Sequence, residues 1–368
     1  MSKNGAGDTT LERRIPKTGS FLTFRATMRI LRTLKSSCLR QLVFIVTAAS
    51  LCCGCSGKGE KPNAHVPSSR GLPYELVVIV PRATYQGELK DSLELVLKGS
   101  TPLLPQHEPL FRLNVAFADS NLTPWRTFRN RLIIKIDPKV SQPAIGVAKD
   151  VIARPQTEVM VTGPTASAIA AFIVAKRELL TDLFVDAELE WQAAQLRRKY
   201  SKMTFEALQE LSGHTICVPQ GLRASKLGKD FLWTGTNLND KDQNFVFYSY
   251  PWNGQPLTAE QFVAKRDSAM KVNIPGSQPN QWMQTAVNPE GREPLILARA
   301  RIINKCAVLE VHGLWEMHNG AIGGAFVSLE RIDTAHGLVL ATEGFIYSPH
   351  SPKRNLMREM EAALRTFK

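Results

Sequence analysis

The sequence has 368 residues, more than one hydrophobic core usually supports, so one large domain or two modest ones are expected. Hydrophobic residues make up 43% and charged residues 21%, which excludes a chain that is disordered throughout. The net charge of +13 is uneven, because residues 1–54 carry nine basic and two acidic side chains while the remainder carries 37 and 31. This small excess of basic over acidic side chains after residue 54 excludes a phosphate-binding stripe, and no nucleic-acid partner is expected.

A charge-free apolar run occupies residues 42–51, and basic residues precede it between Arg29 and Arg40. The run is too short to cross a bilayer, which takes about 20 apolar residues. Its length and its basic flank are those of a signal-peptide core. We therefore expect residues 1–54 to be a cleaved signal peptide, with Met28 as an alternative start that would give a leader of conventional length.

The residues after this run, Leu51-Cys52-Cys53-Gly54-Cys55, resemble the lipobox of bacterial lipoprotein precursors. The lipobox places an aliphatic residue and two small residues before the cysteine that carries the lipid. Cys55 fits best and Cys53 is the alternative, because Cys52 stands where leucine is usual. Two or three acyl chains on that thiol would hold the protein at a membrane. A plain secretory signal, or a Cys-x-x-Cys pair of Cys52 with Cys55, is the competing interpretation.

Residues 55–73 are rich in Gly, Ser, Pro and Lys, which predicts a lipidated, flexible tether. No later segment is apolar and long enough to span a membrane, so a soluble body is expected on one side of it. The start of the tether, Ser-Gly-Lys-Gly-Glu-Lys, lacks the acidic cluster that by analogy directs such lipoproteins to the cell surface. We therefore expect a lipid-anchored envelope protein that faces the periplasm.

Apolar runs and helical periodicity predict the elements of the body from residue 74 to about 205. A buried strand is expected at 75–80, and a helix follows in which Leu89, Leu93, Val96 and Leu97 share one face and Gly99 is the stop. The longest helical pattern runs from about 164 to 200. Further strands are expected at 111–118, 132–137 and 158–162.

The region 206–368 contains a similar mixture of elements. A helix over 259–271 is predicted to start at a capping box, Thr258 with Gln261. The last helix is predicted to have Ser351 as its N-cap. Strands are expected at 215–218, 244–250, 295–303, 307–315 and 338–347. The elements lack regular βαβ alternation, which predicts an α+β fold of mixed or antiparallel sheets with packed helices, in two similar halves, 74–205 and 206–368.

No catalytic constellation is evident in the sequence. It has no Gly-x-Ser-x-Gly elbow after a strand, no Walker loop and no His-Glu-x-x-His, so no catalytic or cofactor-binding residue and no cofactor is predicted. His312, Glu316 and His318 are close enough in sequence to suggest a metal site. Gly313 and Trp315 between them favour a packed strand instead, and no metal site is predicted.

Aromatic residues gather in the second half, near Gly- and Pro-rich loops. Clustered aromatics on loops can stack on sugar rings or peptides, so Tyr248, Tyr250, Trp252 and Trp282 form the candidate binding surface. The competing interpretation, which is the more common role of such residues, is that they fill the core.

Two further cysteines, Cys217 and Cys306, fall in predicted strands of the second half. An exported protein can form a disulfide between them, and two separate thiols are the equally weighted alternative.

The chain after the tether resembles an uncharacterised lipoprotein family of bacteroidete bacteria, known only as a domain of unknown function. The resemblance covers about 71–368 and lies in the order of several short segments. These are Gly71-Leu-Pro-Tyr-Glu75, Gly228-Lys-Asp-Phe-Leu-Trp233, Tyr248-Ser-Tyr-Pro251, Ala264-Lys-Arg-Asp-Ser268, Asn273-Ile-Pro-Gly276, Gly313-Leu-Trp315, Gly323-Gly324 and Lys353-Arg-Asn-Leu356. The resemblance implies a lipid-anchored envelope protein and brings no activity with it.

The sequence as a whole therefore predicts a binding or envelope-maintenance module with an envelope protein or a glycan as partner. An envelope hydrolase, with a site assembled from residues distant in the sequence, is the alternative.

Overall fold

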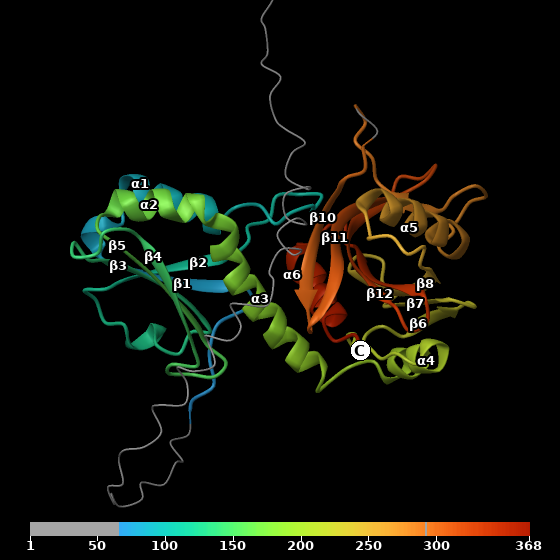
Figure 1. Ribbon diagram of the computed structural model, residues 1–368, viewed down its shortest axis with the longest axis horizontal. Coiled ribbons are helices and arrows are strands. Elements are labelled where there is room, and N and C mark those ends of the chain that lie inside the picture. The colour runs from blue at the N-terminus through green and yellow to red at the C-terminus, as the bar shows by residue number, and fades with distance from the viewer. Residues whose placement is uncertain (1–65, 291–292) are drawn as a thin grey trace, which may run out of the picture. The chain divides into compact units, whose positions relative to one another are not determined.

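The computed structural model describes residues 66–290 and 293–368 (Figure 1). The predicted signal peptide, both candidate lipid-attachment residues, Cys53 and Cys55, and most of the predicted tether lie outside the described residues. The described residues belong to a single compact unit.

The first sheet has five strands in the order β2-β1-β3-β5-β4. All neighbours pair in parallel except β4, which runs antiparallel to β5 at the edge. The strand β1, between β2 and β3, is buried on both faces, which explains its uninterrupted apolar sequence. The strands are β1 (Glu75–Val80), β2 (Arg112–Phe117), β3 (Asn130–Ile136), β4 (Ala144–Lys149) and β5 (Thr157–Gly163).

Helices cover one face of this sheet. The side chains of Leu76, Val78 and Val80 on β1 pack in one cluster with leucines of α1 and isoleucines of α2, and the two helices lie side by side (Figure 1). The opposite face carries a smaller cluster around Val77 and Ile79. The helical elements of this half are η2 (Arg82–Thr84), α1 (Gly87–Leu97), η3 (Thr123–Trp125), α2 (Ala166–Ala175) and α3 (Arg177–Leu196).

The helix expected over 164–200 is two helices, α2 and α3, which meet at Lys176. Lys176 ends α2 with φ of −110° and ψ of 22°, outside the α-helical region, and it also precedes the first turn of α3. Apolar residues continue on both sides of this break, so periodicity alone gives no sign of it.

The last residues of the predicted tether are held against the body. The amide of Ser69 donates to Arg154 O and the amide of Arg70 donates to Thr127 O. The guanidinium of Arg70 also lies over the ring of Phe128, 5.6 Å from its centroid. Because these backbone groups have fixed partners, contact with the body begins near Pro67 and not at Tyr74 as predicted.

The second sheet has strands in the order β10-β11-β12-β13-β8-β7-β6, with β9 pairing on β11, and every pair is antiparallel. Its strands are β6 (Ala224–Leu227), β7 (Phe231–Gly235), β8 (Asp242–Pro251), β9 (Met283–Thr285), β10 (Ile296–Ile303), β11 (Cys306–Met317), β12 (Gly323–Asp333) and β13 (Leu338–Tyr347). The predicted strand 215–218 is wrong, because these residues form no ladder and instead contact the C-terminus through Thr215 and Cys217.

The two faces of this sheet carry different helices. Phe262, Arg266 and Met270 of α5 (Ala259–Asn273) pack on one face, and α6 (Arg354–Leu364) packs on the other (Figure 1). As predicted, Thr258 caps α5 by accepting a hydrogen bond from the Gln261 amide. A third helix, α4 (Lys202–Ser212), ends at Gly213, whose φ of +73° favours glycine.

The entry of α6 differs from the prediction. Ser351 is not its N-cap, because the helix begins at Arg354. The amides of Lys353 and Arg354 donate instead to the carboxylate of Glu108, at 2.6 and 2.9 Å. A residue about 245 positions earlier in the chain therefore satisfies the helix terminus, and no local sequence motif could reveal that.

The α+β class is confirmed by two separate sheets with packed helices. The two halves are not alike, however, since the first sheet is mostly parallel and the second entirely antiparallel. One hydrophobic cluster runs from α1 and β1 through α3 into the second sheet and α6. The division at 205/206 stays a prediction, but the core does not stop there.

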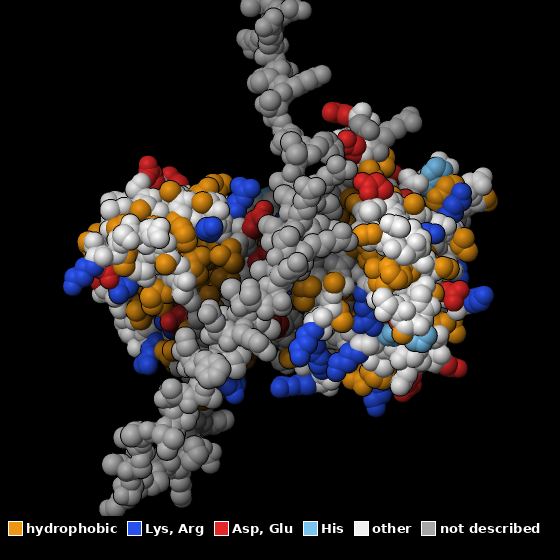
Figure 2. Space-filling view, viewed as in Figure 1, with side chains coloured by type: hydrophobic (Ala, Val, Ile, Leu, Met, Phe, Trp, Pro, Cys, Tyr) orange, Lys and Arg blue, Asp and Glu red, His pale blue; other side chains and the backbone are white. Residues whose placement is uncertain are grey.

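On the face shown in Figure 2, acidic, basic and hydrophobic side chains are interspersed over both halves. Within residues 66–290 and 293–368, no helix has the length and apolar character needed to cross a bilayer.

Candidate functional site

The four aromatic residues predicted as a binding surface are not gathered at one place, although Tyr248 and Tyr250 border a shallow hollow beside α5, and their binding role stays a prediction. Tyr248 and Tyr250 point from β8 toward α5 and are 3% and 9% exposed, because residues two apart on a strand share a face and this face is covered. Trp252 packs against the same cluster from the edge. Trp282 stacks on His318 with 4.0 Å between the ring centroids. These residues are therefore mainly core fillers.

An aromatic hollow of about 490 Å³ lies on the same face of the sheet, beyond the end of α5. Its rings are Trp233 of β7, Trp315 of β11, and Phe345 and Tyr347 of β13. Trp315 and Phe345 form the buried floor, in edge-to-face contact at 5.7 Å, whereas Trp233 and Tyr347 are only half-buried. The hollow exists because α5 stops at Asn273 and leaves this part of the sheet face uncovered.

Polar side chains at the rim of the hollow hold its rings in place. The indole N–H of Trp233 donates to Asn244 Oδ1 at 2.9 Å, and the amide of Asn244 donates to Asp242 at 2.8 Å. The indole N–H of Trp315 donates to the carbonyl of Ile346 at 3.1 Å. The rings are thus fixed by hydrogen bonds within the protein, and the hollow is largely preformed.

No serine, threonine, cysteine or histidine contributes to the described lining of the hollow. Its charged groups are Lys226 and Asp242, and its remaining polar groups are the amides Asn237, Asn244 and Asn273 and the Tyr347 hydroxyl. A hydrolytic site needs a nucleophile beside a base. The arrangement of rings with amides and a carboxylate is suited to binding.

Sequence reasoning placed Trp282 in the candidate surface but missed Trp233, Trp315, Phe345 and Tyr347. These rings come from three strands, β7, β11 and β13, and their neighbours across the sheet are known only from the strand register. Phe345 pairs with Asn244, and Trp233 pairs with Val246. The sign that could have been used is alternation: in the apolar strand 338–347, Phe345 and Tyr347 fall on the same face.

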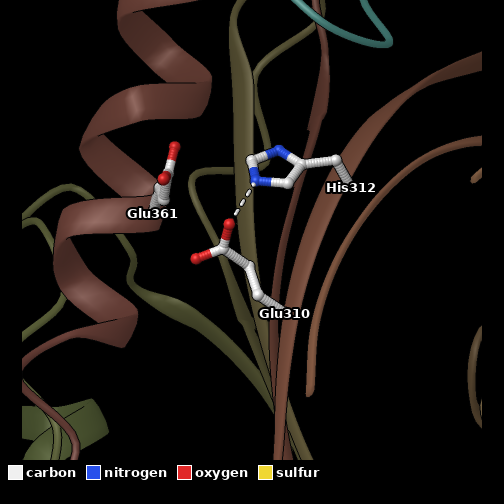
Figure 3. Close-up of side chains that lie close together, drawn as sticks. All are labelled: Glu310, His312 and Glu361. Carbon is white, nitrogen blue, oxygen red and sulfur yellow. Dashed lines mark hydrogen bonds and ion pairs between the residues drawn. The ribbon is translucent and has the colours of Figure 1, made fainter. Parts of the chain in front are cut away.

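The suggested metal group of His312, Glu316 and His318 is also separated in the structure. Glu316 accepts a hydrogen bond from Gln284, and His318 stacks on Trp282. His312 lies four residues before Glu316 on the same face of β11, and its Nε2 is 3.2 Å from Oε1 of Glu310. Glu361 of α6 lies next to this pair (Figure 3).

The cluster of Glu310, His312 and Glu361 borders a cavity of about 110 Å³. Burial alone would raise the pKa of Glu310, but the hydrogen bond with His312 and the nearby charges of His312, Arg365 and Arg301 outweigh burial and lower this pKa. Glu361 is paired with Arg358 at 2.7 Å. The cluster therefore places two carboxyl groups next to an imidazole at the border of a small cavity.

Both remaining cysteines are free thiols in the part of the chain that the structure describes. Cys217 is buried and Cys306 is exposed at the start of β11. Burial raises the pKa of the Cys217 thiol, which makes it a poor nucleophile. The disulfide between them is thus not formed in this structure. Neither thiol lines the aromatic hollow or belongs to the cluster of Glu310, His312 and Glu361.

Two family models match the chain. Residues 69–197 match a domain of unknown function (DUF8532), and residues 201–366 match another domain of unknown function (DUF4837). No curated protein and no solved structure shows significant similarity. The chain is thus similar to uncharacterised families over both halves, with the two matches meeting at the end of α3.

Proposed function

We propose that this protein is a lipid-anchored binding protein of the cell envelope that holds an envelope glycan in the aromatic hollow. The observation that carries the proposal is the hollow itself, with two half-buried rings, Trp233 and Tyr347, over a fixed floor of Trp315 and Phe345. Preformed hollows that combine apolar walls with a few fixed polar groups are the usual form of a ligand site.

The choice of a glycan rests on the chemistry of the lining. A sugar presents an apolar ring face, which suits Trp233 and Tyr347, and hydroxyl groups at its edge, which suit amides and carboxylates. Asn237 and Asp242 stand at the rim and supply such groups. The edge strand β6 borders the hollow through Lys226, so a peptide that pairs with that edge is the alternative ligand.

The anchor follows from the sequence near Cys55, where a signal-peptide core leads directly into a lipobox-like segment. We place the body on the periplasmic side, since the residues after Cys55 lack an acidic cluster. A protein tethered there by lipid meets glycans of the envelope at a high local concentration, which compensates for a modest affinity.

The glycan proposal is tested by calorimetric titration of the full-length protein with solubilised peptidoglycan fragments and with cell-surface polysaccharide. Replacing Trp233 by alanine removes a stacking ring and is expected to weaken binding by about tenfold or more, which corresponds to about 1.4 kcal/mol. The matched control is Trp252→Ala, another half-buried indole of the same half that lies outside the hollow.

Equal binding by the Trp233→Ala and wild-type proteins would overturn the assignment of the hollow. A Trp233→Phe variant keeps an aromatic ring but loses the hydrogen bond that Trp233 donates to Asn244. It should therefore retain part of the affinity. Binding of an envelope peptide instead of either glycan, abolished by the same substitution, would replace the glycan by a peptide as the ligand.

The anchor is tested separately with Cys55→Ala and, as its matched control, Cys53→Ala. The Cys55→Ala protein is expected to leave the membrane fraction and to lose incorporation of labelled fatty acid, whereas Cys53→Ala should retain both. The reverse pattern would move the lipid to Cys53. Membrane retention with label uptake in the double variant would exclude both cysteines.

A further inference from the structure

The cluster on the α6 face of the second sheet combines three ligand-type side chains. Glu310 and His312 are two residues apart on β11 and therefore share a face, and α6 brings Glu361 across from them (Figure 3). One nitrogen or oxygen atom from each of the three lies within 4.8 Å of the others. We propose that Glu310, His312 and Glu361 bind a divalent transition-metal ion of the Zn²⁺ class.

A second observation points to an occupant of this space. Oε2 of Glu310 has no hydrogen-bond partner among the described residues, although the side chain is only 8% exposed. The hydroxyl of Thr101 and Nε of Arg365, both bordering the same cavity, are likewise buried without partners there. Buried polar atoms are nearly always satisfied, so three orphans around one cavity of about 110 Å³ indicate a bound ion with its water.

The hydrogen bonds around the cluster leave oxygen atoms free for the ion. Glu361 uses Oε2 for Arg358, at 2.7 Å, while its Oε1 has only a 3.8 Å ion pair with Arg365. Glu310 likewise uses Oε1 for His312 and leaves Oε2 open. Each carboxylate thus has one oxygen free to coordinate, and metal binding at Nε2 of His312 replaces the hydrogen bond between this nitrogen and Glu310 Oε1.

The donor set decides the class of ion. One imidazole with two carboxylates suits Zn²⁺ and its first-row neighbours, whereas Ca²⁺ takes six to eight oxygen ligands and Mg²⁺ keeps several waters. The arginines around the cavity, Arg299, Arg301, Arg358 and Arg365, oppose a cation, and the carboxylates Glu178, Asp182 and Asp186 offset them. The affinity is therefore expected to be moderate, in the micromolar range.

The test is calorimetric titration of the metal-free, full-length protein with Zn²⁺ alone. One equivalent is expected to bind, and His312→Ala or Glu310→Gln should weaken binding by about 100-fold or more. The matched control is His318→Ala, a histidine from the end of the same strand that stacks on Trp282 and is not part of the cluster. Its affinity for Zn²⁺ should equal that of the wild type.

X-ray absorption of the Zn²⁺-loaded wild-type protein keeps the proposal testable if a variant fails to fold. The expected shell contains nitrogen and oxygen near 2.0 Å and no sulfur. A sulfur shell near 2.3 Å would move the ion to the thiols and overturn the assignment. Absence of binding by the wild type, or loss of binding in His318→Ala alone, would also overturn it. None of these results bears on glycan binding, since the cluster and the hollow lie on opposite faces of the sheet.

Discussion

Glu330 is a carboxyl group of β12 that lies fully buried beneath α5. Burial, together with the nearby Glu343, raises its pKa to about 7 in spite of the hydrogen bond it accepts from the Tyr250 hydroxyl. Tyr248 also lies near it, since burial and the nearby Glu330 raise the pKa of the Tyr248 hydroxyl. Glu330 is therefore protonated in the folded protein over a pH range in which it is ionised in the unfolded chain.

This difference in protonation predicts how the free energy of unfolding changes with pH. Between about pH 4.5 and pH 7 the folded state holds a proton that the unfolded state has released, so the free energy of unfolding falls as the pH rises, by about 3 kcal/mol in total. Glu330→Gln mimics the neutral acid and removes this loss. In urea unfolding the variant should match the wild type near pH 4.5 and exceed its stability at pH 8. Parallel pH profiles for the two proteins would contradict the buried, protonated state.

Arg266 and Glu343 form an ion pair in which both side chains are fully buried, with N–O distances of 2.7 and 2.9 Å. Burial alone would lower the pKa of Arg266, but the carboxylate of Glu343 outweighs burial and raises that pKa. The Arg266 guanidinium also lies over the Phe326 ring, 4.0 Å from its centroid. The pair links α5 to β13 and fixes the face on which the helix packs.

Breaking this pair from one side leaves a charge without its partner. We expect Glu343→Gln to lower the free energy of unfolding by about 3–5 kcal/mol. Replacing both residues together, Arg266→Met with Glu343→Leu, should restore most of the loss, because two apolar side chains need no partner. Chemical denaturation of the single and double variants measures this. A double variant as unstable as the single one would show that packing, not charge, holds α5.

At the scale of elements, α6 shows how a helix can depend on a distant residue. Its first amides, from Lys353 and Arg354, donate to Glu108 in the loop before β2. A carboxylate at a helix N-terminus satisfies free N–H groups and also opposes the positive end of the helix dipole. Glu108 thus does what the sequence assigned to Ser351.

Two alanine substitutions test whether Glu108 or Ser351 caps α6. Glu108→Ala should lower the free energy of unfolding by about 1–2 kcal/mol through loss of the cap. Ser351→Ala should change it by less than about 0.5 kcal/mol, since the Ser351 side chain makes no hydrogen bond to α6. Thermal unfolding of the two variants decides between them, and a larger effect at Ser351 would restore the local cap.

At the scale of the whole molecule, one hydrophobic cluster connects both halves. Ionic contacts reinforce it, since Asp186 of α3 accepts from Arg301 of β10 and from Arg365 just after α6, at 2.8–3.0 Å. A shared core of this kind leaves neither half with a complete interior of its own. The two family matches therefore describe sequence units and not separate cores.

The shared core predicts a single unfolding transition. Leu93→Ala in α1 and Met360→Ala in α6 each remove a fully buried side chain, at a cost of about 2–5 kcal/mol. Both should lower the midpoint of the same calorimetric peak, although they lie in different halves. Two peaks, each shifted by only one of the variants, would contradict the shared core.

The sequence alone determined the elements whose stabilising contacts are local or periodic. The strand Glu75–Val80, the buried face of α1 and the Thr258 cap of α5 occur where the patterns predict them. The sequence contained no sign of β4, an exposed edge strand without apolar alternation. The helical pattern of the sequence also continued through the break between α2 and α3 at Lys176. In these cases the deciding contacts come from other parts of the chain.

Both candidate sites depend on contacts between parts of the chain that are distant in the sequence. His312 was visible in the sequence, but only strand register and the docking of α6 put Glu310 and Glu361 beside it. The hollow joins rings from three strands, and it is open only because α5 ends at Asn273. The sequence by itself determined the α+β class, because that class is written in composition and short-range order, and the lipid anchor at Cys55 stays a prediction. Only the tertiary structure decided which distant side chains meet, because pairing and helix docking place them together and no local spacing records it.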